Sequence, residues 1–103
     1  MRKYRVITTK QAQRDIREIT KYYIDSGSII GGEKVAKKIR AAIRQLKIFP
    51  ELNRRLEGTR DIRIAMAKPY NLYIQVVKRD YLVRVLRVIH MARNVNQAEI
   101  EDF

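Results

Sequence analysis

The sequence contains no cysteine and no tryptophan, and His90 is the only histidine among its 103 residues. Without cysteine the chain forms neither disulfide bonds nor thiolate metal sites, and one histidine does not supply a zinc site. We therefore expect no bound metal and no cofactor. The lack of cysteine fits a reducing compartment, and the fold must depend on its hydrophobic core.

Long apolar runs are also absent. No stretch approaches the roughly 20 apolar residues that a membrane-spanning helix needs, and the basic start of the chain leads into too short an apolar segment for a signal peptide. We expect a cytoplasmic protein with no membrane partner. The length and the 46% hydrophobic content predict one folded domain over residues 1–103, with a short acidic segment at residues 97–103.

Acidic residues are scarce. The chain has 11 Asp and Glu against 23 Lys and Arg, a formal net charge of +12. Residues 1–60 contribute +10 of this charge and residues 61–103 only +2. A surface of this kind predicts a polyanion or an acidic protein as the partner.

Two segments have the apolar period of amphipathic helices. The first, residues 10–25, repeats apolar residues at helical spacing, with Thr8 or Thr9 as N-cap and Ser26-Gly27-Ser28 as terminator. The second is expected to begin between Gly31 and Glu33 and to run to Phe49, where Pro50 stops it. The short link predicts a helical hairpin that packs on a sheet.

The remaining apolar segments are rich in β-branched and aromatic residues. Strands are expected at residues 4–8, 62–67, 70–77 and 81–90, and residues 51–58 are expected to form a loop or one irregular turn. Short connections make the last three strands antiparallel. The predicted fold is α+β, with order β-α-α-β-β-β and the hairpin on one face of a mainly antiparallel four-stranded sheet. The other face is left for solvent or a partner.

The last strand carries two arginines inside an apolar run. Strict alternation puts Arg84 on one face with Leu86, Val88 and His90, and puts Arg87 on the other face with Val83, Val85 and Ile89. Only one arginine can then reach the open face. The other is expected to form an ion pair at the sheet margin, for instance with Asp61 or Asp80.

Charged residues elsewhere are candidates for contact with a phosphate-bearing or acidic partner. We assign target binding to eight residues: Arg54, Arg55, Arg60, Arg63, Lys68, Arg87, His90 and Arg93. The alternative for the loop arginines is a solvated surface. His90 is either a general acid or base, or a structural hydrogen-bonding residue at a strand end.

Several short motifs recur here in a familiar order. They are Tyr4-Arg5-Val6, Thr8, Ala12, Asp15-Ile16, Ile19, Tyr22-Tyr23, Ile43, Leu46, Phe49-Pro50, Ile62-Arg63, Tyr70-Asn71-Leu72-Tyr73 and Arg87-Val88-Ile89-His90. In order and spacing the chain resembles the ParE/RelE superfamily of toxins from type II toxin–antitoxin modules, which act in plasmid stabilisation. The resemblance implies a hetero-oligomer with a cognate acidic antitoxin.

The resemblance leaves two modes of action. RelE-like members cut messenger RNA in the ribosome, whereas ParE-like members are gyrase poisons. Glu57, Arg63 and His90, with Arg87, match a catalytic set of the cutting branch, but no tyrosine follows His90, and Tyr70 stands where an arginine is expected. We therefore expect a ParE-like toxin that binds DNA gyrase and is not an enzyme. The alternatives are a metal-independent endoribonuclease with ribosome and mRNA as partners, and an inactive or regulatory binding module.

Overall fold

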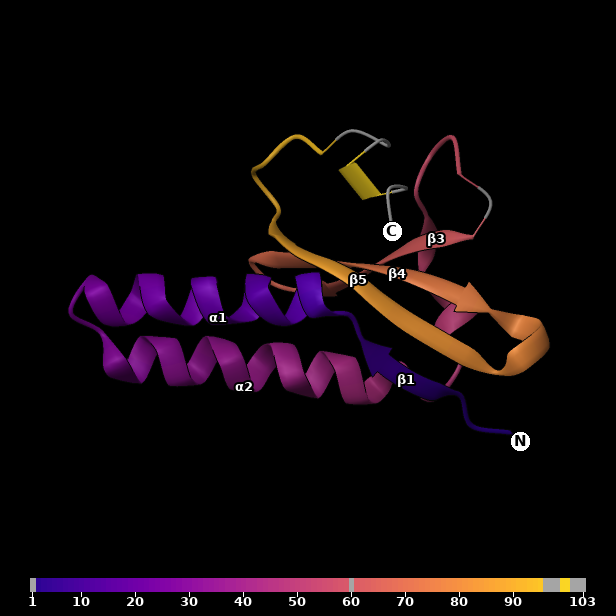
Figure 1. Cartoon of the computed structure of the whole chain (residues 1–103), viewed down its shortest axis with the longest axis horizontal. Helices are drawn as coiled ribbons and strands as arrows, with labels where there is room; N and C mark the ends of the chain where they lie inside the picture. The colour runs from indigo at the N-terminus through magenta and orange to yellow at the C-terminus, as the bar shows by residue number, and fades with distance from the viewer. Residues whose placement is uncertain (1, 60, 96–98, 101–103) are drawn as a thin grey trace.

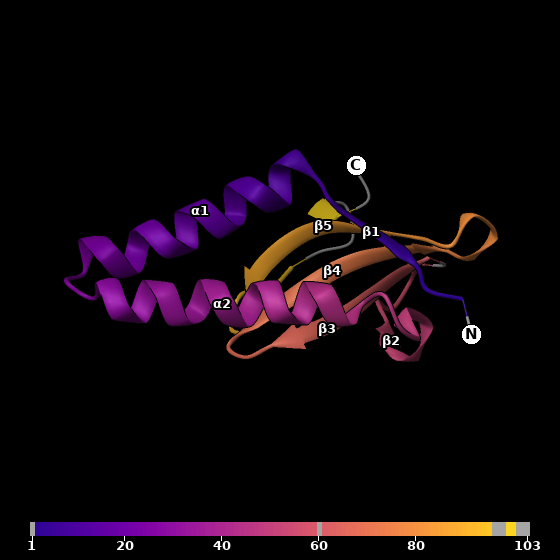
Figure 2. The same ribbon diagram turned by 90° about the horizontal axis from the view of Figure 1, so that it is seen from below.

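The computed structural model describes residues 2–59, 61–95 and 99–100, and it has two helices lying on one side of a twisted sheet (Figure 1). The elements are β1 (Arg5–Thr8), α1 (Lys10–Asp25), α2 (Ile29–Gln45), the 3₁₀ turn η1 (Pro50–Leu52), β2 (Arg54–Arg55), β3 (Ile62–Ala67), β4 (Tyr70–Val77), the 3₁₀ turn η2 (Lys78–Asp80) and β5 (Leu82–His90). The predicted α+β class, with a helical hairpin on a mainly antiparallel sheet, is confirmed. The tip of the hairpin extends past the sheet (Figure 2).

Hydroxyl caps define where both helices start. The Thr9 hydroxyl accepts a hydrogen bond from the Ala12 N–H at 3.2 Å and donates one to the Val85 carbonyl at 2.9 Å. It therefore caps α1 and also fixes that end of the helix to β5. The Ser28 hydroxyl accepts from the Gly31 N–H at 3.0 Å, so α2 begins at Ile29, earlier than the predicted Gly31–Glu33.

The predicted end of α2 was wrong. The helix stops at Gln45 and does not reach Phe49. Beyond it the Leu46 and Lys47 N–H groups donate to carbonyls three residues back, which tightens the last turn. Phe49 then adopts a left-handed conformation, φ 49°, immediately before Pro50. The helix therefore ends by this tightening and reversal, and the proline begins η1.

The sheet has the strand order β1-β5-β4-β3-β2, with β1 parallel to β5 and all other pairs antiparallel. It therefore has five strands, and the prediction of four was wrong. The additional strand is β2, whose Arg54 and Arg55 pair with Ile64 and Arg63 of β3. Residues 51–58, predicted to be a loop or a single turn, contain both η1 and β2. A strand of two residues is too short to show a sequence period.

A β-bulge interrupts the pairing of β5 with β4. Tyr73 lies opposite Arg87 and Ile74 lies opposite Val85, which leaves Leu86 as the extra residue. Val88 consequently packs in the same core cluster as Val83 and Val85, while Ile89 packs with Leu86 in the other cluster. The strict alternation expected for β5 therefore holds through Leu86 and is wrong for Val88 and Ile89.

Each face of the sheet carries a core cluster. The larger one lies between the helices and the sheet and includes Ile39, Leu72 and Ile74, which are fully buried. The smaller one lies on the opposite face and includes Ile64, Tyr73, Leu86 and Ile89. Ile100 completes the smaller cluster and has 0% exposure.

The face opposite the helices is therefore partly covered by the chain itself, which corrects the prediction that it is left for solvent or a partner. Of the acidic segment predicted at residues 97–103, only Glu99 and Ile100 belong to the described residues. The rest of that segment lies outside them.

Candidate functional site

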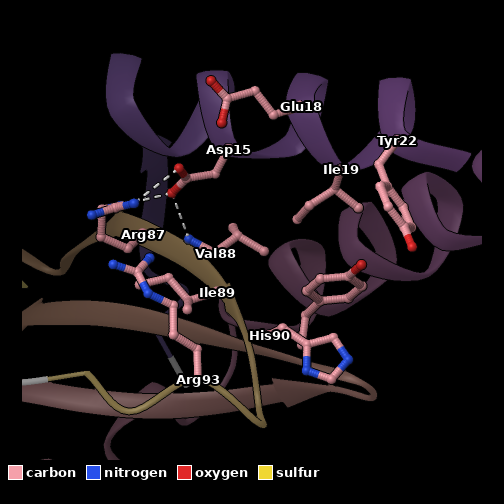
Figure 3. Close-up of a pocket in the computed structure, with 10 residues that line it drawn as sticks. Asp15, Glu18, Ile19, Tyr22, Arg87, Val88, Ile89, His90 and Arg93 are labelled. Carbon is pink, nitrogen blue, oxygen red and sulfur yellow. Dashed lines mark hydrogen bonds and ion pairs between the residues drawn. The ribbon is translucent and has the colours of Figure 1, made fainter. Parts of the chain in front are cut away.

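A cleft of about 280 Å³ opens between α1 and the end of β5 (Figure 3). Asp15, Glu18, Ile19 and Tyr22 reach it from α1, and Tyr70 reaches it from β4. The other side is formed by Arg87, Val88, Ile89 and His90 of β5 and by Arg93 beyond it. Three of the eight predicted target-binding residues, Arg87, His90 and Arg93, are brought together here.

The inner end of the cleft is closed by an ion pair between Asp15 and Arg87. The Asp15 carboxylate accepts from the Arg87 guanidinium at 2.8 and 3.2 Å, and also from the Val88 N–H at 3.0 Å and the Gln11 amide at 3.2 Å. The side chains are only 6% and 16% exposed. The hydrogen bond and charge of Asp15 raise the pKa of Arg87. Arg87 is therefore held as a link between α1 and the bulge of β5.

This partner differs from the predicted Asp61 or Asp80. Asp80 lies near its neighbour Arg79, at 3.6 Å, and Arg84 donates to the Gln75 side chain at 2.9 Å. Sequence reasoning missed the structural role of Asp15, although a signal existed. Asp15 follows Ala12 by three residues and precedes Ile19 by four, which places a carboxylate in the apolar stripe of α1.

His90 lies at the outer end of the cleft, and its contacts are structural. Its Nδ1 accepts a hydrogen bond from the Ala92 N–H at 3.0 Å, and its ring stands edge-on to Tyr70 with centroids 5.4 Å apart. Burial and the neighbouring hydroxyl of Tyr23 raise the pKa of Tyr70 to about 12. The Tyr70 hydroxyl therefore holds its proton more tightly than a free tyrosine does. Arg93 pairs with Glu99 at 3.0 Å.

The other predicted site residues lie away from the cleft. Arg54 and Arg55 are exposed in β2, and Lys68 is exposed in the β3–β4 turn. Arg63 donates to the Asn53 carbonyl at 2.7 Å and so holds the chain between η1 and β2. Arg60 lies outside the described residues.

The sheet register separates the residues of the possible catalytic set. Arg63 is paired with Ile74 of β4, whereas Arg87 is on β5, two strands from β3. Glu57 lies in the turn before Ile62, and His90 is paired with Tyr70, which is itself opposite Ala67 at the other end of β3. A six-residue strand spans roughly 17 Å. Glu57 and His90 therefore sit at opposite ends of the sheet.

A longer groove follows the outer side of the helical hairpin. Two cavities of about 430 and 450 Å³ share Ile16, Arg17 and Arg40 and together extend from Thr8 to Ile24. Their apolar floor includes Ile16, Ile24, Ala36 and Ile43. Their charged lining consists of Arg17, Lys21, Arg40 and Arg44 against Glu33 alone. The groove is therefore apolar at its base and basic at its rim.

Two further site classes find no candidate in the described part of the chain. Residues 2–59, 61–95 and 99–100 contain no group of three or more His, Cys, Asp or Glu that could hold a metal ion. Among the same residues no helix is both long and apolar enough to cross a membrane.

Three solved structures share this arrangement of helices and strands. One is described as the chromosomal ParDE TA system from P. aeruginosa, with TM-score 0.71 and 16% identity over 84% of this chain and 95% of that chain. A second is the RelBE2 toxin–antitoxin complex from Mycobacterium tuberculosis, with TM-score 0.67 and 19% identity over 85% and 98%. The third is a variant of the E. coli toxin RelE in the free state, with TM-score 0.65 and 18% identity over 99% and 93%. The chain therefore has the RelE/ParE-like fold.

The family follows from the sequence match. The family model of the ParE toxin of the type II toxin–antitoxin system parDE matches residues 6–95, most of the chain. The chain belongs to the ParE toxin family, and the resemblance noted from its motifs is confirmed. No curated protein matches the sequence.

Proposed function

We propose that this ParE-family toxin acts by binding DNA gyrase, without catalysis, and that a cognate acidic antitoxin neutralises it. The observation that carries the choice of binding over cleavage is that Glu57 and Arg63 lie away from the cleft that Arg87 and His90 line. Arg63 and Arg87 hold elements of the fold together, and the Nδ1 atom of His90 accepts a backbone hydrogen bond. A nuclease needs such groups around one phosphate.

The outer groove of the hairpin supports the antitoxin. An apolar floor with four basic side chains and one acid at its rim fits an amphipathic helix whose polar face is acidic. A flexible acidic segment that orders on binding also suits a domain with a net charge of +12. The groove and the cleft lie on different sides of α1, since their linings share no residue of that helix.

The target is tested with purified toxin and DNA gyrase in a supercoiling assay. Supercoiling should fall as toxin is added, or cleaved DNA complexes should accumulate, and the antitoxin encoded beside the toxin should restore activity. Normal supercoiling at saturating toxin would count against gyrase. Primer extension on translated messages is the matching test for cleavage. New RNA ends that vanish in the Arg63→Ala or His90→Ala protein would replace the binding mechanism with an endoribonuclease.

The antitoxin groove is tested by a charge reversal with a matched control. Arg40 lines both cavities, so Arg40→Glu should weaken antitoxin binding about tenfold or more, because the acidic helix would then meet a like charge. Lys78→Glu makes the same change in net charge in η2, away from the groove, and should leave the affinity within about twofold. Equal effects of the two variants would mean that the antitoxin responds to the net charge of the toxin and not to the groove.

A further inference from the structure

The turn that follows α2 presents three large apolar side chains to solvent. Ile48, Phe49 and Leu52 are 47%, 50% and 80% exposed. The segment that carries them connects the end of α2 remote from the hairpin turn to β2 (Figure 2). Neither core cluster includes them. We call these three residues the 48–52 patch.

The backbone under the 48–52 patch is firmly held. Pro50 is buried, the Leu52 N–H donates to the Phe49 carbonyl at 3.1 Å, and the Asn53 side chain donates to the Pro50 carbonyl at 2.9 Å. Tyr4 of the neighbouring β1 end donates its hydroxyl to Glu51 at 2.9 Å. The patch is thus fixed to the fold at both ends, because Arg63 of β3 also holds the Asn53 carbonyl.

The backbone conformation of Phe49 is a second indication that the 48–52 patch is a binding site. Its φ of 49° and ψ of 49° lie in the left-handed region, which an aromatic residue adopts at an energetic cost. A strained residue is retained where its surroundings fix it, and such residues concentrate at sites that contact ligands. Exposed apolar side chains on a preorganised backbone lose little entropy on binding, and they form effective anchors at protein interfaces.

The charges around the patch indicate the kind of partner. Arg44 and Lys47 precede it and Arg54 and Arg55 follow it, all of them exposed, while the only acid in residues 44–55 is Glu51, which the Tyr4 hydroxyl contacts. A second copy would bring basic groups against basic groups, which charge repulsion opposes. Aliphatic groups such as Ile48 and Leu52 neither stack on bases nor bind phosphates, so a nucleic acid is a poorer match. An apolar pocket rimmed by carboxylates on a protein is complementary.

We propose that the 48–52 patch is the docking surface for an acidic surface of the toxin's protein target. The proposal rests on the proposed function, since it takes that target to be gyrase and names the residues that contact it. Arg44 belongs both to the basic surround of the patch and to the outer groove. An antitoxin that reaches Arg44 therefore competes for the same positive charge, which accounts for neutralisation.

The test uses the double variant Phe49→Asn/Leu52→Ser. Asparagine tolerates the left-handed conformation, and Leu52 is mostly exposed, so the fold should be retained. The concentration of toxin that halves gyrase supercoiling should rise roughly thirtyfold, the change that a 2 kcal/mol anchor represents. Ile30→Ser removes an equally apolar side chain, 68% exposed, at the hairpin tip and should change this concentration less than about twofold. Circular dichroism checks that the double variant is folded. If it is not, the single variant Leu52→Ser takes its place in the assay.

The outcomes separate the patch from the identity of the target. If the wild-type protein inhibits gyrase and the folded variant inhibits it equally, the 48–52 patch is not the docking surface, and gyrase remains the target. A wild-type protein that arrests growth without affecting gyrase, together with a folded variant that does not arrest growth, would show that gyrase is not the target. The 48–52 patch would then remain the docking surface for another protein. If the wild-type protein and the variant both arrest growth and neither inhibits gyrase, the docking surface and the gyrase target are both overturned. Patch-dependent binding of the wild-type protein to phosphatidylglycerol vesicles or to duplex DNA would overturn a protein as the occupant.

Discussion

Replacing Arg87 by methionine tests the role of the Asp15–Arg87 pair most sharply. Methionine fills much of the volume of the arginine stem but leaves the Asp15 carboxylate without its cation. That carboxylate is 6% exposed. Two of its donors remain, the Val88 N–H at 3.0 Å and the Gln11 amide at 3.2 Å.

The geometry sets the size of the effect. Breaking a buried ion pair by removing one partner costs about 3–5 kcal/mol. The two remaining donors place Arg87→Met at the lower end, ~3 kcal/mol. A domain of this size has about 5–15 kcal/mol of stability in total. Since 1 kcal/mol shifts the melting temperature of such a domain by roughly 4–8 °C, we expect a loss of about 12 °C or more.

Urea unfolding followed by circular dichroism gives the free energies for a double-mutant cycle. Arg87→Met, Asp15→Asn and the combined variant should be strongly non-additive, because the second change removes the unpaired charge that the first creates. Arg84→Met is the matched control on the same strand, where the guanidinium contacts a neutral side chain, and it should cost about 1 kcal/mol or less. A loss below about 1 kcal/mol for Arg87→Met, with additive effects in the cycle, would refute the structural role of the pair.

Three further predictions concern stability. Ile100→Ala should cost about 2–4 kcal/mol in urea unfolding because the side chain is fully buried in the smaller core cluster, and no change would mean that the segment does not cover the sheet. Thr9→Ala should cost about 1–2 kcal/mol, since it removes the cap of α1 and its bond to β5, while Thr9→Ser should retain most of the stability. Burial raises the pKa of Tyr4 and Tyr70 from 10.0 to about 12, so the folded state holds these protons more tightly than the unfolded state. Stability should be highest below pH 10 and should fall as the pH rises through about 12, and a flat stability profile over that window would contradict both shifts.

Features set by local sequence were predictable. The spacing of apolar residues identified α1, and the segments predicted for β3 and β4 match the observed strands. The hydroxyl of Thr9 was one of two predicted caps. Each of these depends on interactions within about ten residues, for which composition and period carry the information.

Features set by long-range contacts were not predictable. The bulge at Leu86 changes the faces on which Val88 and Ile89 pack, and no residue type marks it. Arg87 pairs with Asp15 of α1, 72 residues away in the sequence. The partners expected from the sequence, Asp61 and Asp80, are nearer to Arg87 along the chain. The candidate catalytic residues are of the types that a nuclease site needs, but residue types alone do not show whether they lie together. Only the register showed Glu57 and His90 at opposite ends of the sheet.

We propose that this toxin acts on gyrase by binding and not by cutting RNA. The most direct measurement is a gyrase supercoiling assay with purified toxin, run with and without its antitoxin, alongside a translation reaction analysed for new messenger RNA ends. We expect loss of supercoiling, its recovery with antitoxin, and intact messages. Unaffected supercoiling together with cleaved messages would contradict it.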